Sequence, residues 1–342
     1  MLRPITRRGA LACVAGCFAA GQALAAPSSL PDAPTIVVAG PAGGRIDHWA
    51  AVIAEPLGRG LQQGSALSRQ NVGGADGVTG ANQFQARAAP DGATALLVPG
   101  AAALSWLTGD SRVRFDAGRW VPLWGADLSA ALASRTPLTA GRRVRMALQS
   151  VAGPELAALL ALDLMGVEVE PIRTDLASAR PLERADVDLV LLRGAELRNG
   201  AADLASRGWA LALGFGAIGA NGELSRDPSL PNLPLAQELI GAGRPEHPAE
   251  LSAALRAVTA AMKLDLALVL PQLSPAALVA WWRRGCVGLA GAPEVQAEAA
   301  RTLVRPIGPG GAAACVSSIS VDGPVLLELR RWLAERYQWR PS

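Results

Sequence analysis

The sequence has little of the chemistry that most enzymes use. Its 342 residues include two histidines, His48 and His247, and a single tyrosine. It has no GxSxG nucleophile elbow, no HExxH zinc motif and no GxxxxGK[ST] phosphate loop. We therefore predict no catalytic residues, no metal ligands and no cofactor. A Cys-His nucleophile remains an open alternative that nothing in the local sequence supports.

Lysine is also nearly absent, since only Lys263 occurs and arginine carries the remaining positive charge. Lysine and arginine together number 32 against 29 acidic residues, and without Arg3, Arg7 and Arg8 the balance is even. Proteins that bind nucleic acids through counterion release need a basic stripe, which this composition does not supply. We therefore expect no nucleic-acid partner.

The first 25 residues have the pattern of an export signal. Arg3, Arg7 and Arg8 precede an apolar run at residues 9–20, and residues 23–25 offer a small-residue cleavage site. Both a Sec signal and a twin-arginine signal fit this pattern, and a lipoprotein acylated at Cys17 is a third interpretation. We predict a signal peptide over residues 1–25 and a periplasmic location.

Few cysteines remain once this leader is removed. Cys286 and Cys315 form a candidate disulfide in an oxidising compartment, or else they are two separate buried thiols. Further along, the apolar stretch at residues 264–282 is interrupted by Asp265 and two prolines, so it does not predict a membrane span.

What the chain does have is a repeated strand, glycine turn and helix near its start. Residues 35–39 form a β-branched run typical of a buried parallel strand, and a glycine turn and a helix follow. Apolar side chains recur at helical spacing in that helix, and Asp47 is a candidate cap for it. A helix amino terminus of this kind attracts anions.

A second unit of the same kind follows at once. A glycine-rich turn at residues 71–80 leads into a short helix that ends at Ala88, and a strand follows at residues 95–98. In open α/β sheets, ligands bind beyond the carboxyl ends of the strands. We therefore expect both turns to face one ligand at the same sheet edge.

These residues resemble the Bug-type substrate-binding receptors of tripartite tricarboxylate transporters. The matching stretches are residues 42–47, 71–80 and 86–97, which correspond to the family's PGGGTD, NRPGAGGxxG and ARAxPDGYTLL. Looser matches continue to Gly243. Beyond Gly243 the register is open, because both residues 243–245 and residues 286–293 resemble the family's WFGLFAPAGTP.

The resemblance implies a type II periplasmic binding fold with two doubly wound α/β lobes, a hinge and a ligand cleft between them. Lobe 1 would comprise residues 34–133 and 236–342, and lobe 2 residues 134–235. It implies a monomer that captures a small organic acid, with backbone amides holding the carboxylate. The partners would be integral membrane permease subunits or a membrane sensor.

Departures from the family pattern point to individual side chains. Arg45 replaces a loop glycine and is a candidate bidentate clamp for a carboxylate, or else a solvated loop arginine. Residues 149–153 replace a serine-rich loop, and with Pro154 as the first residue of a helix they predict a second anion pocket. The predicted ligand-binding residues, all in turns, at helix starts or at strand ends, are Gly43, Gly44, Arg45, Asp47, His48, Asp76, Gly77, Ser150, Arg173 and Arg193.

The sequence thus favours a periplasmic solute-binding protein that performs no chemistry. Two alternatives remain: a secreted enzyme on the same fold, and a divergent receptor or sensor component that no longer binds a small acid.

Overall fold

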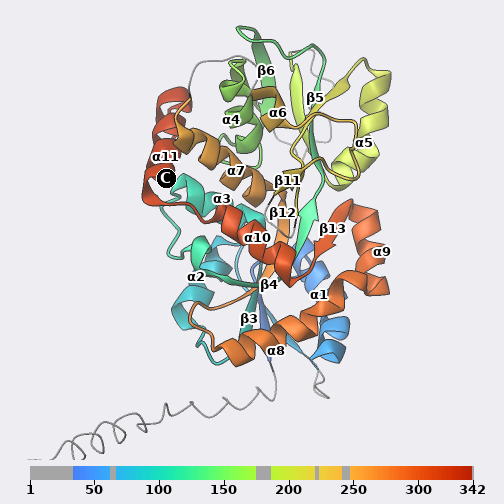
Figure 1. Cartoon of the computed structure of the whole chain (residues 1–342), viewed down its shortest axis with the longest axis vertical. Helices are drawn as coiled ribbons and strands as arrows, with labels where there is room; N and C mark the ends of the chain where they lie inside the picture. Colours follow the sequence, from blue (N-terminus) through green and yellow to red (C-terminus); the bar gives the residue numbers. More distant parts are fainter. Residues whose placement is uncertain (1–33, 62–66, 175–185, 220–222, 241–246, 341–342) are drawn as a thin grey trace, which may run out of the picture. The chain divides into compact units, whose positions relative to one another are not determined.

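The computed structural model describes residues 34–61, 67–174, 186–219, 223–240 and 247–340 (Figure 1). The predicted signal peptide and its cleavage site lie outside these residues. The described chain forms two main β-sheets with helices packed around them, and a two-stranded ribbon of β10 (Ala217–Ile218) and β11 (Leu224–Ser225).

The first sheet has six strands in the order β13-β4-β12-β3-β1-β2. The predicted repeat supplies three parallel strands, β1 (Thr35–Val38), β2 (Ser68–Asn71) and β3 (Thr94–Val98). β12 (Leu264–Leu270) returns from far along the chain and pairs antiparallel with both β3 and β4 (Val121–Leu128). β13 (Val304–Ile307) closes the other edge beside β4.

Helices cover both faces of this sheet. Successive residues of β1 alternate between two apolar clusters, with Ile36 and Val38 in one and Val37 in the other. The first cluster is covered by α1 (Arg45–Gly60), α8 (Ala276–Val287) and α9 (Pro293–Thr302), and the second by α2 (Val78–Arg87), α3 (Gly100–Thr108) and α10 (Pro309–Ile319). This two-sided burial explains the continuous apolar runs in the strands.

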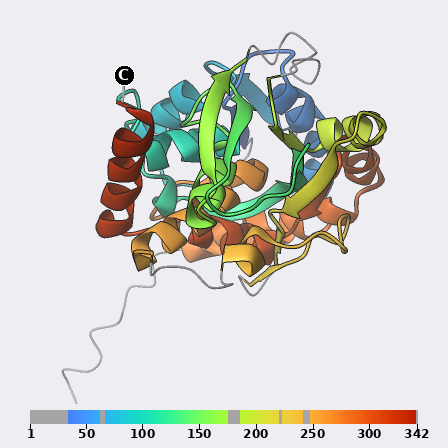
Figure 2. The same cartoon turned by 90° about the horizontal axis from the view of Figure 1, so that it is seen from above.

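The second sheet has five strands in the order β7-β6-β8-β5-β9. β6 (Arg143–Leu148) runs parallel to β7 (Glu168–Arg173) and β8 (Leu189–Arg193), whereas β5 (Ala130–Ser134) runs antiparallel to β8 and β9 (Ala210–Gly214). α4 (Leu156–Leu164) packs on one face and α5 (Ala195–Ser206) on the other (Figure 2).

The chain crosses from the first sheet to the second at Ser129, between β4 and β5. The second sheet therefore begins at Ala130, four residues before the predicted start of lobe 2 at Ser134. The chain returns to β12 of the first sheet through α6 (Ala236–Ile240) and α7 (Ala249–Lys263). The division into lobes at these residues otherwise stays a prediction.

α7 joins the two sheets. It contacts α4 from the second sheet as well as α3, α10 and α11 (Gly323–Tyr337), as Figure 1 shows. One apolar cluster is continuous across this region, so the sheets share a core on the α7 side.

In the described part of the chain, no single helix is long and apolar enough to cross a membrane. Only α10 and α11 taken together reach that length, and they are bent by 64°. Within the same residues no group of histidine, cysteine or acidic side chains is arranged to hold a metal ion.

Candidate functional site

The two glycine turns lie side by side at the carboxyl end of β1. Gly80 approaches Ala39 so closely that a Cβ atom there would lie 2.7 Å from the Cα atom of Ala39. Gly77 has a φ of 77°, and a Cβ atom at that position would lie 2.6 Å from Pro99. Only glycine fits this conformation and this spacing without strain. The second turn is therefore held against the ends of β1 and β3, next to the first turn.

The first turn leads directly into α1. The helix begins at Arg45 with Gly44 as its N-cap, so Asp47 lies in the first turn and not at the cap position that we predicted. Its Oδ2 atom accepts a hydrogen bond from the Gly43 N–H at 2.8 Å. This hydrogen bond lowers the pKa of the Asp47 carboxyl group below its usual value. Asp47 thus holds the loop from inside the helix, and no side chain caps α1.

A pocket of about 210 Å³ opens beside the start of α1, between the two sheets. Gly194, at the end of β8, forms part of its wall; a Cβ atom there would lie 2.7 Å from Leu128 and 2.9 Å from the Thr302 carbonyl oxygen. The pocket is lined from both sheets by Arg45, Trp49, Leu128, Arg193, Gly194, Ala195, Glu196, Asp265, Thr302 and Val304. We call it the intersheet pocket.

Two predicted site residues, Arg45 and Arg193, meet in the intersheet pocket. Arg45 Nη1 pairs with Asp265 Oδ1, and Arg193 Nη1 donates to the Met262 carbonyl oxygen at 3.3 Å. Burial and then the positive charge of Arg193 lower the pKa of Arg45 to about 10. The Arg45 side chain nevertheless keeps 54% of its surface exposed, so its guanidinium group stays charged at neutral pH. The pocket therefore brings two cationic groups from different sheets close together.

The second predicted anion pocket, at residues 149–153, is arranged differently. α4 begins at Leu156 and not at Pro154, because residues 150–156 form turns closed by hydrogen bonds from Gly153 N–H to the Ser150 carbonyl and from Leu156 N–H to the Gly153 carbonyl. The Glu155 carboxyl group lies over this turn, with Oε2 3.1 Å from the position of a Gly153 Cβ atom. Burial raises the pKa of Glu155. A carboxyl group of the chain itself thus lies beside the turn where we predicted an anion, and the anion pocket stays a prediction.

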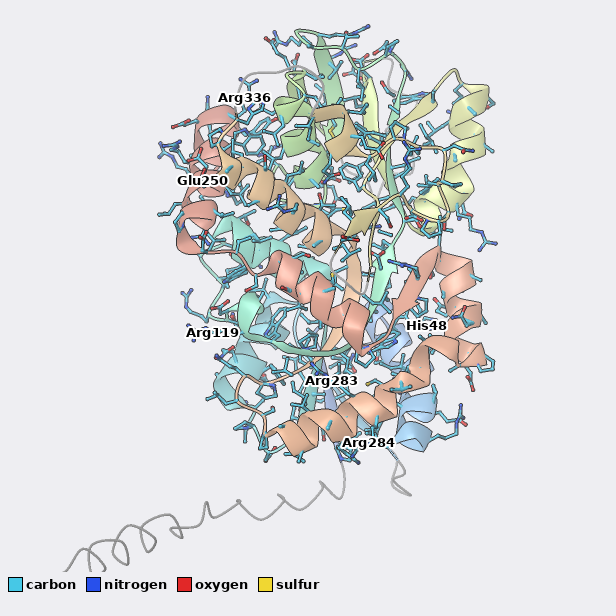
Figure 3. All side chains as sticks on the ribbon, viewed as in Figure 1. His48, Arg119, Glu250, Arg283, Arg284 and Arg336 are labelled. Carbon is cyan, nitrogen blue, oxygen red and sulfur yellow. The ribbon has the colours of Figure 1, made fainter. Side chains whose placement is uncertain are left out.

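The remaining predicted residues do not line the intersheet pocket. His48, which is labelled in Figure 3, is exposed near the start of α1. Its Nε2 atom lies 3.1 Å from Glu298 Oε2 on α9. Asp76 pairs with Arg112 at 2.8 Å, and Ser150 Oγ accepts from the Ala152 N–H. Arg173 is exposed at the end of the edge strand β7. Gly43, Gly44 and Gly77 lie in the adjoining turns.

The sequence reasoning missed the other eight residues that line the pocket, among them Trp49, Glu196 and Asp265. Asp265 had a usable signal, because it is the single charged residue in the otherwise apolar strand β12. Trp49 had none, since its place in the helical apolar pattern predicts only core packing.

A second charged cluster surrounds the chain's only lysine. The Lys263 side chain is fully buried, and its Nζ atom lies 3.5 Å from Asp127 Oδ1 and 3.7 Å from Asp227 Oδ2. Arg305 Nη2 lies 2.9 Å from Asp127 Oδ2 and 3.2 Å from the Ile218 carbonyl oxygen. We call these four side chains the Lys263 network. It ties β4, α7 and β13 to the segments around β10 and β11.

The two cysteines are separate free thiols. Cys286 is buried in the α1-α8-α9 cluster and Cys315 in the cluster on the opposite face of the sheet. The candidate disulfide is therefore not formed. Burial raises the pKa of both thiols, which disfavours the nucleophilic thiolate.

No protein-family profile matches this sequence, and no curated protein matches it either. Solved structures match it in fold. A TctC solute-binding protein from Polaromonas, solved without ligand, is 15% identical; the match covers 91% of this chain and 100% of that one, with a TM-score of 0.65.

Two further matches have TM-scores of 0.50. The periplasmic binding protein BugD is 16% identical, with 89% of this chain and 97% of that one covered. The protein Rpa4515 from R. palustris, solved with adipate, is 16% identical, with 90% and 97% covered. At these identities the likeness shows the fold: this chain has the α/β fold of TctC and Bug-type periplasmic binding proteins, as the sequence predicted.

Proposed function

We propose that this chain is a divergent solute-binding receptor of the tripartite tricarboxylate transporter type, exported to the periplasm by a Sec or twin-arginine signal. It captures a small organic acid between its two lobes and carries out no reaction. A monomer would then deliver the acid to membrane permease subunits or report it to a membrane sensor. Closure of the lobes around the hinge would give the partner a ligand-dependent shape to recognise.

The observation that carries this proposal is the meeting of Arg45 and Arg193 in the intersheet pocket. Arg45 comes from the first sheet's α1 and Arg193 from the end of β8, so one carboxylate between them would bridge both lobes. Guanidinium groups bind carboxylates through charge-assisted and often bidentate hydrogen bonds. The uncapped amino terminus of α1 adds a favourable field for an anion at the same place.

The fold supports the same assignment. Rpa4515, which shares this fold, was solved with the dicarboxylate adipate. Of the predicted residues, Arg45 and Arg193 line the pocket, and Gly43 and Gly44 lie in the turn that leads into α1.

Thermal-shift measurements with mono-, di- and tricarboxylates, aromatic acids and amides test the proposal. A ligand present at about 100 times its Kd adds ~2.7 kcal/mol to the free energy of unfolding, so a true ligand raises Tm by several degrees. Turnover of any acid would favour the secreted enzyme instead.

One observation favours a second candidate, a receptor that no longer binds a small acid. The pocket volume of about 210 Å³ lies below the range of ~300–1,000 Å³ that is usual for ligand sites, and Asp265 already pairs with Arg45. This candidate would be supported if no acid of the panel raised Tm and a membrane protein copurified with the chain.

A further inference from the structure

The intersheet pocket carries its own negative charges. Asp265 and Glu196 line it together with Arg45 and Arg193, which gives two acidic and two basic side chains. A dicarboxylate would add two negative charges to an already balanced and partly enclosed site. Burying uncompensated charge is costly, so this balance disfavours a dianion.

Two buried polar atoms of the pocket residues have no hydrogen-bond partner within the described residues. One is Asp265 Oδ2, an acceptor on a residue that is 2% exposed. The other is the indole Nε1 of Trp49, a donor on a residue that is 0% exposed. Native proteins rarely leave such atoms unpaired, and an unpaired buried donor or acceptor costs about 1–3 kcal/mol. A bound molecule that offers both a donor and an acceptor would relieve both.

The fixed positions of these groups define what each would contact. Asp265 lies at the start of β12, where Oδ1 pairs with Arg45 and Oδ2 is buried without a hydrogen-bond partner within the described residues. Trp49 lies one helical turn after Arg45 on α1, and its ring packs at a tilt of 53° against the buried Trp124, with the ring centroids 6.2 Å apart. Its indole is therefore held in place by packing.

We infer that the intersheet pocket selects a small acid that also carries a hydrogen-bond donor, an ammonium or a primary amide, and that Asp265 accepts from this donor. The inference rests on the proposed function and narrows its ligand class. Arg45, Arg193 and the Trp49 N–H would face the carboxylate end, and Asp265 with Glu196 at the rim would face the donor end. The volume of about 210 Å³ corresponds to ~7 water molecules at ~30 Å³ each, which limits the ligand to a short chain.

A four-carbon series tests the inference, because its members differ at one end only. The donor-bearing probes are 4-aminobutanoate and succinamate, and the donor-free probes are butanoate and succinate. Calorimetric titration of the full chain should give at least ~10-fold tighter binding for 4-aminobutanoate than for succinate, because a charge-assisted hydrogen bond supports only the former.

Variants then assign the preference to Asp265. In Asp265→Asn the preference for 4-aminobutanoate over succinate should fall by about tenfold, while succinamate loses less, because asparagine keeps an acceptor but not the charge. Glu196→Gln at the exposed rim should change the same ratio in the same direction by a smaller factor. Glu335→Gln, on the exposed face of α11, is the matched control and should change nothing.

The outcomes separate the two levels of the proposal. Equal or tighter binding of succinate or butanoate by the wild type would overturn the donor inference and leave the carboxylate receptor standing. The donor inference would also be overturned if Asp265→Asn and Glu196→Gln left the preference for 4-aminobutanoate over succinate unchanged. If none of the four probes binds, the inference is also overturned. If, in addition, no acid of the thermal-shift panel raises Tm, the proposed function is overturned as well.

Discussion

The intersheet pocket and the Lys263 network both bring basic and acidic side chains together, but they differ in whether these side chains are fully paired. In the Lys263 network, one buried lysine and Arg305 face two buried aspartates. Asp127, Asp227 and Arg305 also line a pocket of about 300 Å³, but in the described part of the chain none of the four side chains has a buried polar atom without a partner. In the pocket, Arg45 keeps half its surface exposed and Asp265 keeps one oxygen unpaired. A cluster whose charges are mutually satisfied holds the fold, whereas one with unpaired atoms beside open volume is ready for a ligand.

The largest expected effect is the loss of the Lys263 charge. Lys263→Met leaves Asp227 buried without its cation and should lower the free energy of unfolding by about 3–5 kcal/mol, the usual cost of breaking a buried ion pair from one side. Urea denaturation followed by circular dichroism measures it. Arg284→Met on the exposed face of α8 is the control and should stay within about 0.5 kcal/mol. Equal effects of the two substitutions would mean that the network does not hold the fold.

Arg45→Ala should act mainly on binding. The substitution should weaken binding of the acid with the largest thermal shift by about 10- to 100-fold, since it removes a charge-assisted contact. Arg59→Ala, on the exposed last turn of the same helix, should leave the affinity unchanged. Titration calorimetry compares the two. An unchanged affinity in Arg45→Ala would remove Arg45 from the site.

Asp47→Asn should destabilise the first turn by about 1 kcal/mol at neutral pH, because the Gly43 N–H loses a charged acceptor. The folded-state pKa of Asp47 is depressed, so its contribution is fully present above the unfolded value of ~3.9 and is lost as the pH falls through the folded value. The stability difference between wild type and variant should therefore shrink below about pH 4. A difference that does not shrink as the pH falls below about 4 would contradict this role.

The smallest effect concerns the cysteines. A reducing agent should leave Tm unchanged, because Cys286 and Cys315 are already free thiols. A disulfide between them would contribute ~3 kcal/mol, and its reduction would lower Tm by several degrees. A thiol-reactive dye should label neither residue until the protein is unfolded.

Local sequence patterns predicted much of this structure. The β-branched run before Gly40 and the helix from Pro154 both occur, within one or two residues of the expected bounds. The type II fold is confirmed by the two sheets and by the solved structures that share it.

The pocket was harder to predict, because it depends on residues distant in the sequence. Arg45 and Arg193 could be proposed from local departures at a helix start and a strand end. The pairing of Arg45 with Asp265 could not, because these residues lie 220 positions apart in the sequence and meet only once β12 inserts between β3 and β4. No local pattern encodes that register.

The most direct test of the account is a crystal structure of the chain grown with the acid that gives the largest thermal shift. The account predicts ligand density in the intersheet pocket, with a carboxylate between Arg45 and Arg193. Density at any other place, with the Arg45 and Asp265 pair intact and the pocket without ligand, would contradict it.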